Sequence, residues 1–273
     1  MRKGLLGLLF CFFSIIAFSQ SIPSYWMNIY GLDKLYLKRN ENVKQMIVNV
    51  TGFYSSGSNY EEKWIFNFQD SGKIIGQKFM DGQLVSNFEY EFDTLGNIIQ
   101  EINNSKLPLR GWNTLIIQKE FHDGHLILEK HLDGEKKLSD FVRFDYDASG
   151  KPIKLSLNNS LGQLMSYETA EYNMETLTYD YKVFNSKGEL ISHQKNYCDP
   201  DTSANRKNDY HDYIIVKWPG TNPDTKILHH FEYEYDSFGN WTKRKWLIAE
   251  GKKNTKRSIT TRKIIYSNTN PTQ

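Results

Sequence analysis

The most chemistry-like cluster in this sequence places a histidine among carboxylates, with Asp209, His211 and Asp212 within four residues. A histidine held by carboxylates can act as a general base. No serine or cysteine nucleophile accompanies them, because the nearest thiol, Cys198, lies in a loop-like stretch without an adjacent basic residue. We therefore expect a protein that is not an enzyme.

Other histidines suggest metal binding, which the sequence supports weakly. His122 and His125 flank an Asp-Gly turn, and His131 follows nearby. Two histidines on a hairpin can bind a metal, but no cysteine or carboxylate completes a set at these turn positions. His229 and His230 are neighbours on an expected strand, so their side chains point to opposite faces and cannot share an ion. We expect neither a metal nor a cofactor.

Two rows of acidic residues resemble the carboxylate pairs of sugar hydrolysis. One row is Glu89, Glu91 and Asp93, and a second row of the same kind lies in residues 231–236. In both rows the acidic residues alternate with aromatic ones. Alternation along a strand places the carboxylates on one face, so we interpret the rows as the solvated side of a sheet.

Binding residues are better candidates than catalytic ones. Trp112 and Trp218 fall in two stretches that interrupt the strand pattern, residues 103–113 and 196–225, which we predict to be irregular loops. An exposed tryptophan in a loop is a common anchor for protein partners and for sugars. The alternative is that each ring folds back over the end of a sheet.

A basic segment supplies the second group of binding candidates. Residues 241–263 contain nine basic residues and one acidic residue. Anionic lipid headgroups, a polyanionic glycan or an acidic protein would suit such a surface, and we expect no nucleic-acid partner. The alternative is that the basic residues balance the acidic strands nearby. The candidates chosen are Lys243, Arg244, Lys245 and Arg257.

These candidates must be positioned by β-strands. Residues 64–69, 88–93 and 231–236 alternate aromatic and polar side chains, which is typical of strands with one packed and one solvated face. Asp-x-x-Gly or Asn-x-x-Gly turns follow the strands, and Asp-Gly pairs mark tight hairpins between them. The pattern predicts an all-β fold, an antiparallel up-and-down meander of repeated hairpins that forms a curved open or partly closed sheet. We expect one domain over residues 20–273, with a short helix possible only in residues 21–42.

The N-terminus indicates export. Arg2 and Lys3 precede an apolar run, and the small residues Ala17 and Ser19 precede Gln20, so residues 1–19 read as a cleavable signal peptide. Its removal takes two of the 34 basic residues and leaves 32 basic against 32 acidic ones. It also leaves Cys198 as the only cysteine, so no intramolecular disulfide can form. We expect a periplasmic or surface location, without a transmembrane span in the mature chain.

The repeated unit resembles bacterial tyrosine–aspartate (YD, or Rhs-like) repeats. The copies lie at residues 231–240, 88–97 and 144–151, and the resemblance covers residues 43–190 and 228–266. It implies a curved β-sheet, which in large relatives winds into a shell around a toxin. This chain has too few repeats to close a shell, and only a polar tail follows residues 263–266. The resemblance thus implies a small non-toxin member with an exposed edge or concave face for another protein.

These observations favour a non-enzymatic interaction scaffold, an accessory subunit of a bacterial envelope assembly such as one serving secretion. An envelope or outer-membrane protein is the expected partner. The alternative is a module that binds carbohydrate or another envelope polymer through the loop tryptophans and the basic segment. An enzyme built on Asp209, His211 and Asp212 ranks last.

Overall fold

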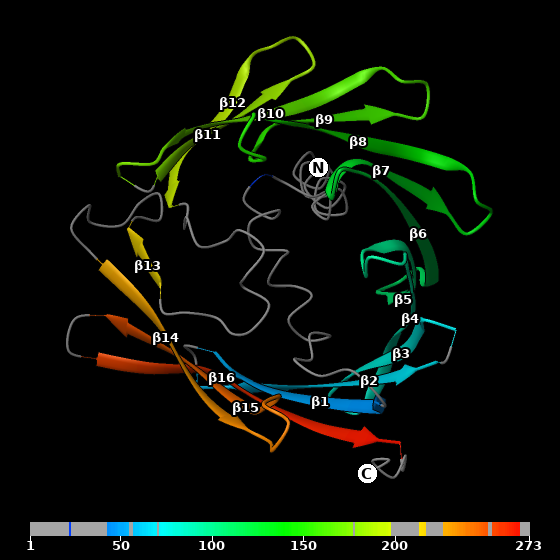
Figure 1. The fold of residues 1–273 in the computed structure, drawn as a ribbon, viewed down its shortest axis with the longest axis vertical. Helices are drawn as coiled ribbons and strands as arrows, with labels where there is room; N and C mark the ends of the chain where they lie inside the picture. Colours follow the sequence, from blue (N-terminus) through cyan, green and yellow to red (C-terminus); the bar gives the residue numbers. More distant parts are fainter. Residues whose placement is uncertain are drawn as a thin grey trace, which may run out of the picture.

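A computed structural model describes residues 22, 43–54, 57–69, 71–176, 178–197, 213–216, 226–250 and 253–267. Its strands belong to one sheet (Figure 1). In chain order they are β1 (Val43–Phe53), β2 (Asn59–Phe68), β3 (Lys73–Met80), β4 (Gln83–Phe92), β5 (Ile98–Leu107), β6 (Gly111–His122), β7 (His125–Asp133), β8 (Leu138–Tyr146), β9 (Pro152–Asn159), β10 (Leu164–Asn173), β11 (Thr178–Asn185), β12 (Leu190–Tyr197), β13 (Tyr213–Val216), β14 (Lys226–Tyr235), β15 (Trp241–Glu250) and β16 (Lys253–Tyr266). The predicted all-β antiparallel meander is confirmed.

The sheet is nearly a ring, and among the described strands the two at its ends, β12 and β13, come from consecutive parts of the chain rather than from its termini. β1 pairs with β2 on one side and with β16 on the other, so the first and last strands are neighbours. From there, each described strand pairs with the next in sequence, out to β12 in one direction and to β13 in the other. Figure 1 shows the sheet curling until these two edge strands approach the same side of the molecule.

The Asp-x-x-Gly turns form as predicted. The backbone N–H groups of Leu95 and Asn97 donate to Asp93 Oδ1 at 2.9 and 2.8 Å, and Gly96 adopts a φ of 83°. Gly tolerates this left-handed conformation, which lets the chain re-enter the sheet. The same side-chain cap occurs at Asp147, Asn159, Asn185 and Asp236.

One expected tight turn is wrong. Asp133 and Gly134 were predicted to form an Asp-Gly hairpin, but Asp133 Oδ1 instead accepts hydrogen bonds from the N–H groups of Glu135 and Lys137. Lys136 adopts the left-handed φ of 64° in place of a glycine. The capping carboxylate therefore selects the longer turn over the two-residue one.

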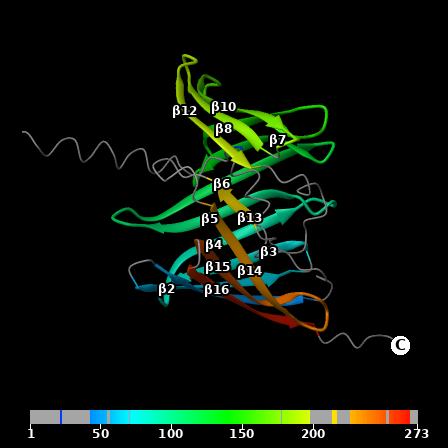
Figure 2. The same ribbon diagram turned by 90° about the vertical axis from the view of Figure 1, so that its left-hand side faces the viewer.

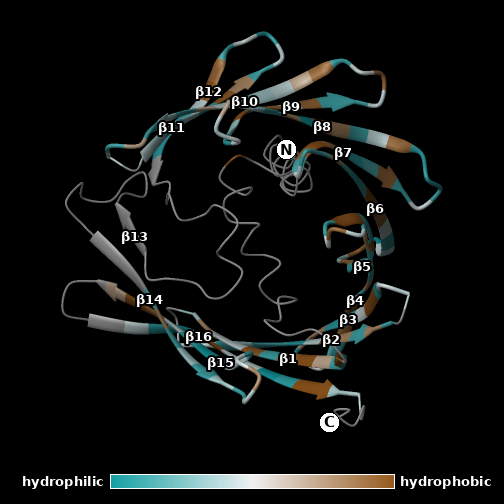
Figure 3. Cartoon of the chain, in the orientation of Figure 1, coloured by the Kyte–Doolittle hydropathy of each residue, from teal (hydrophilic) through white to brown (hydrophobic). Residues whose placement is uncertain are grey.

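The inward face of the sheet is the packed one. A single curled sheet crowds the side chains on its concave side, and on β1 the side chains of Met46, Val48 and Val50 are buried in alternation with more exposed neighbours. Figure 3 shows hydrophobic and hydrophilic positions mixed along most strands, as alternation requires. On the outward face, ion pairs such as Lys73–Glu89 link neighbouring strands, as the acidic rows predicted.

Gly76 allows close packing between β3 and β4. It lies opposite Phe88, whose ring covers it so closely that a Cβ atom on Gly76 would lie 2.2 Å from ring carbons. Phe88 also contacts the rings of Trp64, Phe66 and Tyr90, with centroid distances of 5.3 to 5.6 Å. The glycine therefore makes room for the aromatic row that the sequence predicted.

Residues 103–113 are not the irregular loop that was predicted. β5 continues to Leu107 and β6 starts at Gly111, so residues 108–110 alone form the turn. The polar residues that suggested a loop have partners within the sheet, because Asn103 Oδ1 accepts hydrogen bonds from the Ser86 hydroxyl of β4 at 2.6 Å and from the Ser105 hydroxyl of its own strand at 2.7 Å. Polar residues that find such partners can belong to a strand, so a polar sequence alone does not indicate a loop.

The other predicted interruptions lie mostly outside the described residues. Within 196–225 the structure describes the end of β12 and all of β13, so the predicted irregular loop contains strand residues. In residues 21–42 it describes Ile22 alone. The signal peptide, Cys198, the cluster at 209–212 and Trp218 lie outside the described residues.

Candidate binding site

The turn between β5 and β6 is the most exposed apolar feature of the described chain. Leu109 is fully exposed, and Trp112, the second residue of β6, is 46% exposed. Pro108, Arg110 and Gly111 are exposed between them. Figure 2 shows this hairpin extending past the neighbouring turns at its end of the sheet. We call residues 108–112 the β5–β6 tip.

Leu109 is in an unusual backbone conformation. Its φ is 65°, in the left-handed region that glycine, asparagine and aspartate adopt more easily than a bulky residue. The other non-glycine residues with positive φ among the described residues are Asp81, Asp123 and Lys136. Strained backbone conformations cluster at active sites and ligand-contact regions. The conformation therefore marks the β5–β6 tip as a candidate contact surface.

The predicted basic residues of β15 do not form one surface. Lys243 and Lys245 project outward and pair with Glu234 at 2.6 Å and Glu232 at 2.8 Å, as the charge-balance alternative expected. These pairs lower the pKa of Glu232 and raise that of Lys245, chiefly through their hydrogen bond. Arg244, between these two lysines on β15, lies on the inward face of the sheet.

The inward arginines gather around a tryptophan. Arg244 lies opposite buried Thr260, and its guanidinium is 5.2 Å from the Trp241 ring centroid. Arg262 of β16 stacks closer on the same ring, at 3.3 Å. Arg257 falls where the pairing of β15 with β16 shifts register, so it occupies a β-bulge. Because successive side chains on a strand point to opposite faces, the basic residues of this segment are divided between the inward and outward faces of the sheet.

A charged network, which the sequence reasoning missed, lies on the inward face of β5 to β8. His131 contacts Asp140 Oδ1 through Nδ1 at 2.6 Å and Glu129 Oε1 through Nε2 at 2.8 Å. Burial lowers the pKa of His131, but hydrogen bonds and charges from both carboxylates outweigh it and raise the pKa to about 9. Lys119 continues the network, pairing with Glu101 at 2.5 Å and lying 3.9 Å from Glu129.

The network stabilises charge and leaves His131 little capacity for catalysis or metal binding. Both of its ring nitrogens are engaged by carboxylates, so neither is available as a base or a ligand. No group of histidine, cysteine, aspartate and glutamate within the described residues has the arrangement of a metal site. His122 is exposed beside Asp123, and His125 packs on Tyr146 with ring centroids 4.8 Å apart.

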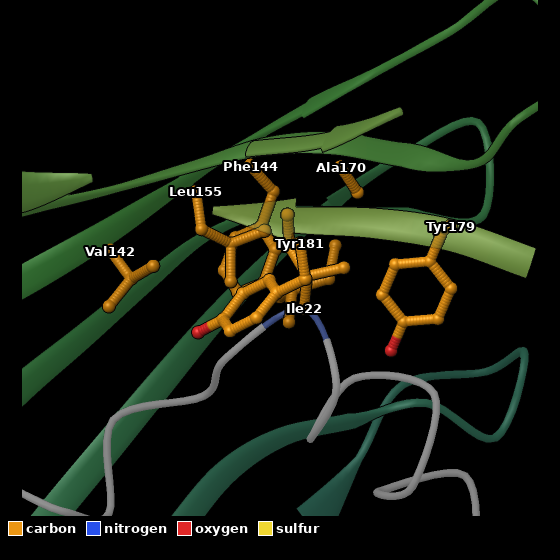
Figure 4. Packing of buried hydrophobic residues seen from close by; sticks show 8 residues of the cluster. Ile22, Val142, Phe144, Leu155, Ala170, Tyr179 and Tyr181 are labelled. Carbon is orange, nitrogen blue, oxygen red and sulfur yellow. The ribbon is translucent and has the colours of Figure 1, made fainter. Parts of the chain in front are cut away.

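A second feature that the sequence did not indicate is the seat of Ile22. This side chain is completely buried in a cluster with residues of β7 to β11. The first of these residues, Leu126, lies more than a hundred positions after Ile22 in the sequence. Figure 4 shows Ile22 among Phe144, Leu155 and Tyr181. Its backbone N–H donates to Glu168 Oε2 at 2.8 Å.

Comparisons with known proteins show no family for this chain. No protein-family model matches the sequence. No curated protein matches it either. No helix within the described residues combines the length and apolarity needed to cross a membrane.

Solved structures offer distant likenesses. A porin-like protein from Bacteroides uniformis ATCC 8492 is 10% identical, with a TM-score of 0.41, over 83% of this chain and 99% of that one. A putative outer membrane lipoprotein-sorting protein domain from Vibrio parahaemolyticus is 13% identical, with a TM-score of 0.20, over 63% and 90%. The Pseudomonas aeruginosa MucA/MucB complex matches at 9% identity and a TM-score of 0.16, over 90% and 94%. TM-scores this low carry no inference about activity.

Proposed function

We propose that this protein is a non-enzymatic interaction scaffold of the bacterial envelope, an accessory subunit of a larger assembly such as one serving secretion. The export signal read from residues 1–19 supports the location. The observation that supports the interaction role is the β5–β6 tip, where a fully exposed leucine with positive φ lies near a half-exposed tryptophan. The curled sheet beneath supplies a rigid base for it.

The tip has the chemistry of a protein contact. Burying Leu109 and Trp112 against a partner would contribute about 2 kcal/mol for each side chain. Arg110 between them is suited to interfaces, because a guanidinium both stacks and donates hydrogen bonds. A protein surface with an apolar recess and an acidic rim would complement this tip.

Site-specific photo-crosslinking tests the proposal in the bacterium that makes the protein. A benzophenone amino acid replaces Leu109 in the full chain, or replaces Leu161 as the matched control. Leu161 is a suitable control because it is 81% exposed on the β9–β10 turn and has no tryptophan beside it. We expect one discrete envelope-protein adduct from position 109, abolished by Trp112→Ser, and none from position 161. Equal adducts from both positions, or none from 109, would contradict the proposal.

Carbohydrate binding is the second candidate, and the exposure of Trp112 favours it because sugars stack on exposed indole rings. A glycan array separates the two functions. Binding by the mature chain that disappears with Trp112→Ala, without loss of the folded circular dichroism spectrum, would support the carbohydrate role. An array without bound glycans would eliminate it.

A further inference from the structure

The strand β12 lies at one end of the curled sheet and exposes apolar side chains (Figure 1). Among the described strands it pairs with β11 alone, so no described strand uses the backbone N–H and C=O groups on its other side. Leu190 is 56% exposed and Ile191 is 64% exposed, both at the start of β12. An exposed edge strand of eight residues is a surface on which another chain can pair. We call the side of β12 away from β11 the β12 edge.

The exposed residues continue an apolar row on the outward face of the sheet. Tyr167 of β10 and Phe184 of β11 lie opposite each other, and their rings stack with centroids 4.7 Å apart. Leu190 lies opposite Phe184 on the next strand, and Ile191 is the extra residue of a β-bulge. The row therefore ends in solvent at the β12 edge. An apolar side chain on an added strand would continue the row and bury Leu190 and Ile191.

The other half of β12 is basic. Lys195 is exposed and lies opposite Asp180, but Asp180 Oδ1 pairs with His193 at 3.2 Å. The sequence of β12 contains no acidic residue. Opposite charges on neighbouring strands attract, so an acidic residue on an added strand would interact favourably with the Lys195 ammonium group.

We propose that the β12 edge binds an extended segment of another polypeptide, which adds a strand to the sheet. An apolar residue of the segment packs on Leu190 and Ile191, and an acidic residue lies opposite Lys195. The chain's own β11 has this complementary pattern, because it places Phe184 opposite Leu190 and Asp180 opposite Lys195. Backbone hydrogen bonds supply affinity in such strand addition, and the side chains supply specificity. This site is separate from the β5–β6 tip, so it goes beyond the scaffold role proposed above.

A second copy of this chain fits the β12 edge less well. In a two-fold antiparallel pair, the middles of the two β12 strands lie opposite each other, so His193 and Lys195 of both copies would lie close together. Leu190 and Ile191 of the two copies would lie at opposite ends of the pair and would not pack on each other. A lysine on an edge strand also discourages pairing between identical copies. Lys195 therefore favours an acidic segment over a second copy.

Fluorescence anisotropy with a peptide of the β11 sequence, residues 178–185, tests the proposal. The labelled peptide is titrated with the full mature chain, and we expect saturable binding. Lys195→Glu should weaken binding about fivefold, because an attraction across strands becomes a repulsion. Lys187→Glu is the matched control, since Lys187 is exposed on the β11–β12 turn, and it should leave binding unchanged. Circular dichroism confirms that both variants are folded.

A charge-swapped peptide tests the same contact without altering the protein. With lysine at the position of Asp180, the peptide should bind the wild-type chain about fivefold more weakly than the original peptide does. The swapped peptide should bind the Lys195→Glu chain more tightly than the wild-type chain. A general effect of charge would not produce this reversal.

Backbone methylation tests whether the peptide binds as a strand. Alternate N–H groups of a strand point to opposite sides, so only one alternate set can donate to the β12 edge. Two peptides, each N-methylated on one of these sets, should therefore differ: one should lose binding and the other should keep it. Hydrogen exchange of the wild-type chain should also slow at residues 190–197 when the original peptide is added.

Four results would overturn the proposal. They are no saturable binding of the peptide, equal effects of Lys187→Glu and Lys195→Glu, equal binding of the two methylated peptides, and unchanged hydrogen exchange at residues 190–197. Sedimentation of the wild-type chain without peptide tests the other occupant. A dimer that Ile191→Asp abolishes would assign the β12 edge to a second copy and would also overturn the proposal. None of these results affects the crosslinking expected from position 109.

Discussion

Raising the pH from 6 to 9.5 should destabilise this protein through one histidine. His131 is 10% exposed in its side chain and is held between Asp140 and Glu129 at 2.6 and 2.8 Å. Burial alone would lower its pKa, but the hydrogen bonds and charges of the two carboxylates raise the pKa from 6.5 to about 9. The folded state therefore stabilises the protonated form of His131.

The size and sign of the effect follow from linkage. The rise in pKa corresponds to about 3 kcal/mol of folding free energy, at roughly 1.4 kcal/mol for each pH unit. A group with a raised folded pKa contributes fully below its unfolded pKa, near pH 6.5. The contribution is lost as the pH increases through the folded value, near pH 9. The free energy of unfolding should therefore decrease by about 3 kcal/mol across this window.

Urea unfolding of the mature chain at pH 6 and pH 9.5 measures the loss. The His131→Gln chain should be less stable at pH 6 and should lose most of this pH dependence. The His122→Gln chain should keep it, because His122 is exposed beside its turn. The reasoning is refuted if the wild-type chain is equally stable at both values, or if His131→Gln keeps the full slope.

Three further perturbations test the packing, a turn and the charged network. Gly76→Val should lower the free energy of unfolding by about 1 to 3 kcal/mol in urea titrations, because the new side chain collides with the Phe88 ring. Asp147→Ala should cost about 1 kcal/mol by the same assay, since two backbone N–H donors lose their acceptor. The lowered pKa of Asp147 also means that its contribution is present above its ordinary pKa and disappears as pH decreases. Glu129→Gln should lower the pKa of His131 in an NMR titration; an unchanged value would exclude Glu129 as a cause.

The sequence predicts the local architecture well because its determinants are local. The alternation in residues 231–236 decides which side chains face solvent, and Glu232 and Glu234 do pair outward with lysines of β15. Asp93 and its equivalents specify their turns through hydrogen bonds no more than four residues long. The residues that determine each of these features lie within a single hairpin.

The candidate site is predicted less well because its determinants are not local. Trp112 was identified, but its neighbour Leu109 became informative only when its positive φ and full exposure were visible. The pair Glu129 and His131 shares one face of β7 by its spacing of two, yet Asp140 joins it only through the pairing with β8. Ile22 carries no periodic signal at all. Its burial is decided by strands that the chain reaches more than a hundred residues later.

Pairing between β1 and β16 means that the sheet is completed late in synthesis. Met46 and Val48 are completely buried, yet they lie on β1, opposite Ile264 and Arg262 of β16. Until β16 is made and crosses, β1 is an open edge with apolar side chains, the kind of strand that invites aggregation. Such long-range pairing is slow, because closing a long loop costs entropy before any contact compensates for it. The part of the sheet around β1 is therefore completed only after the residues of β16 have been made.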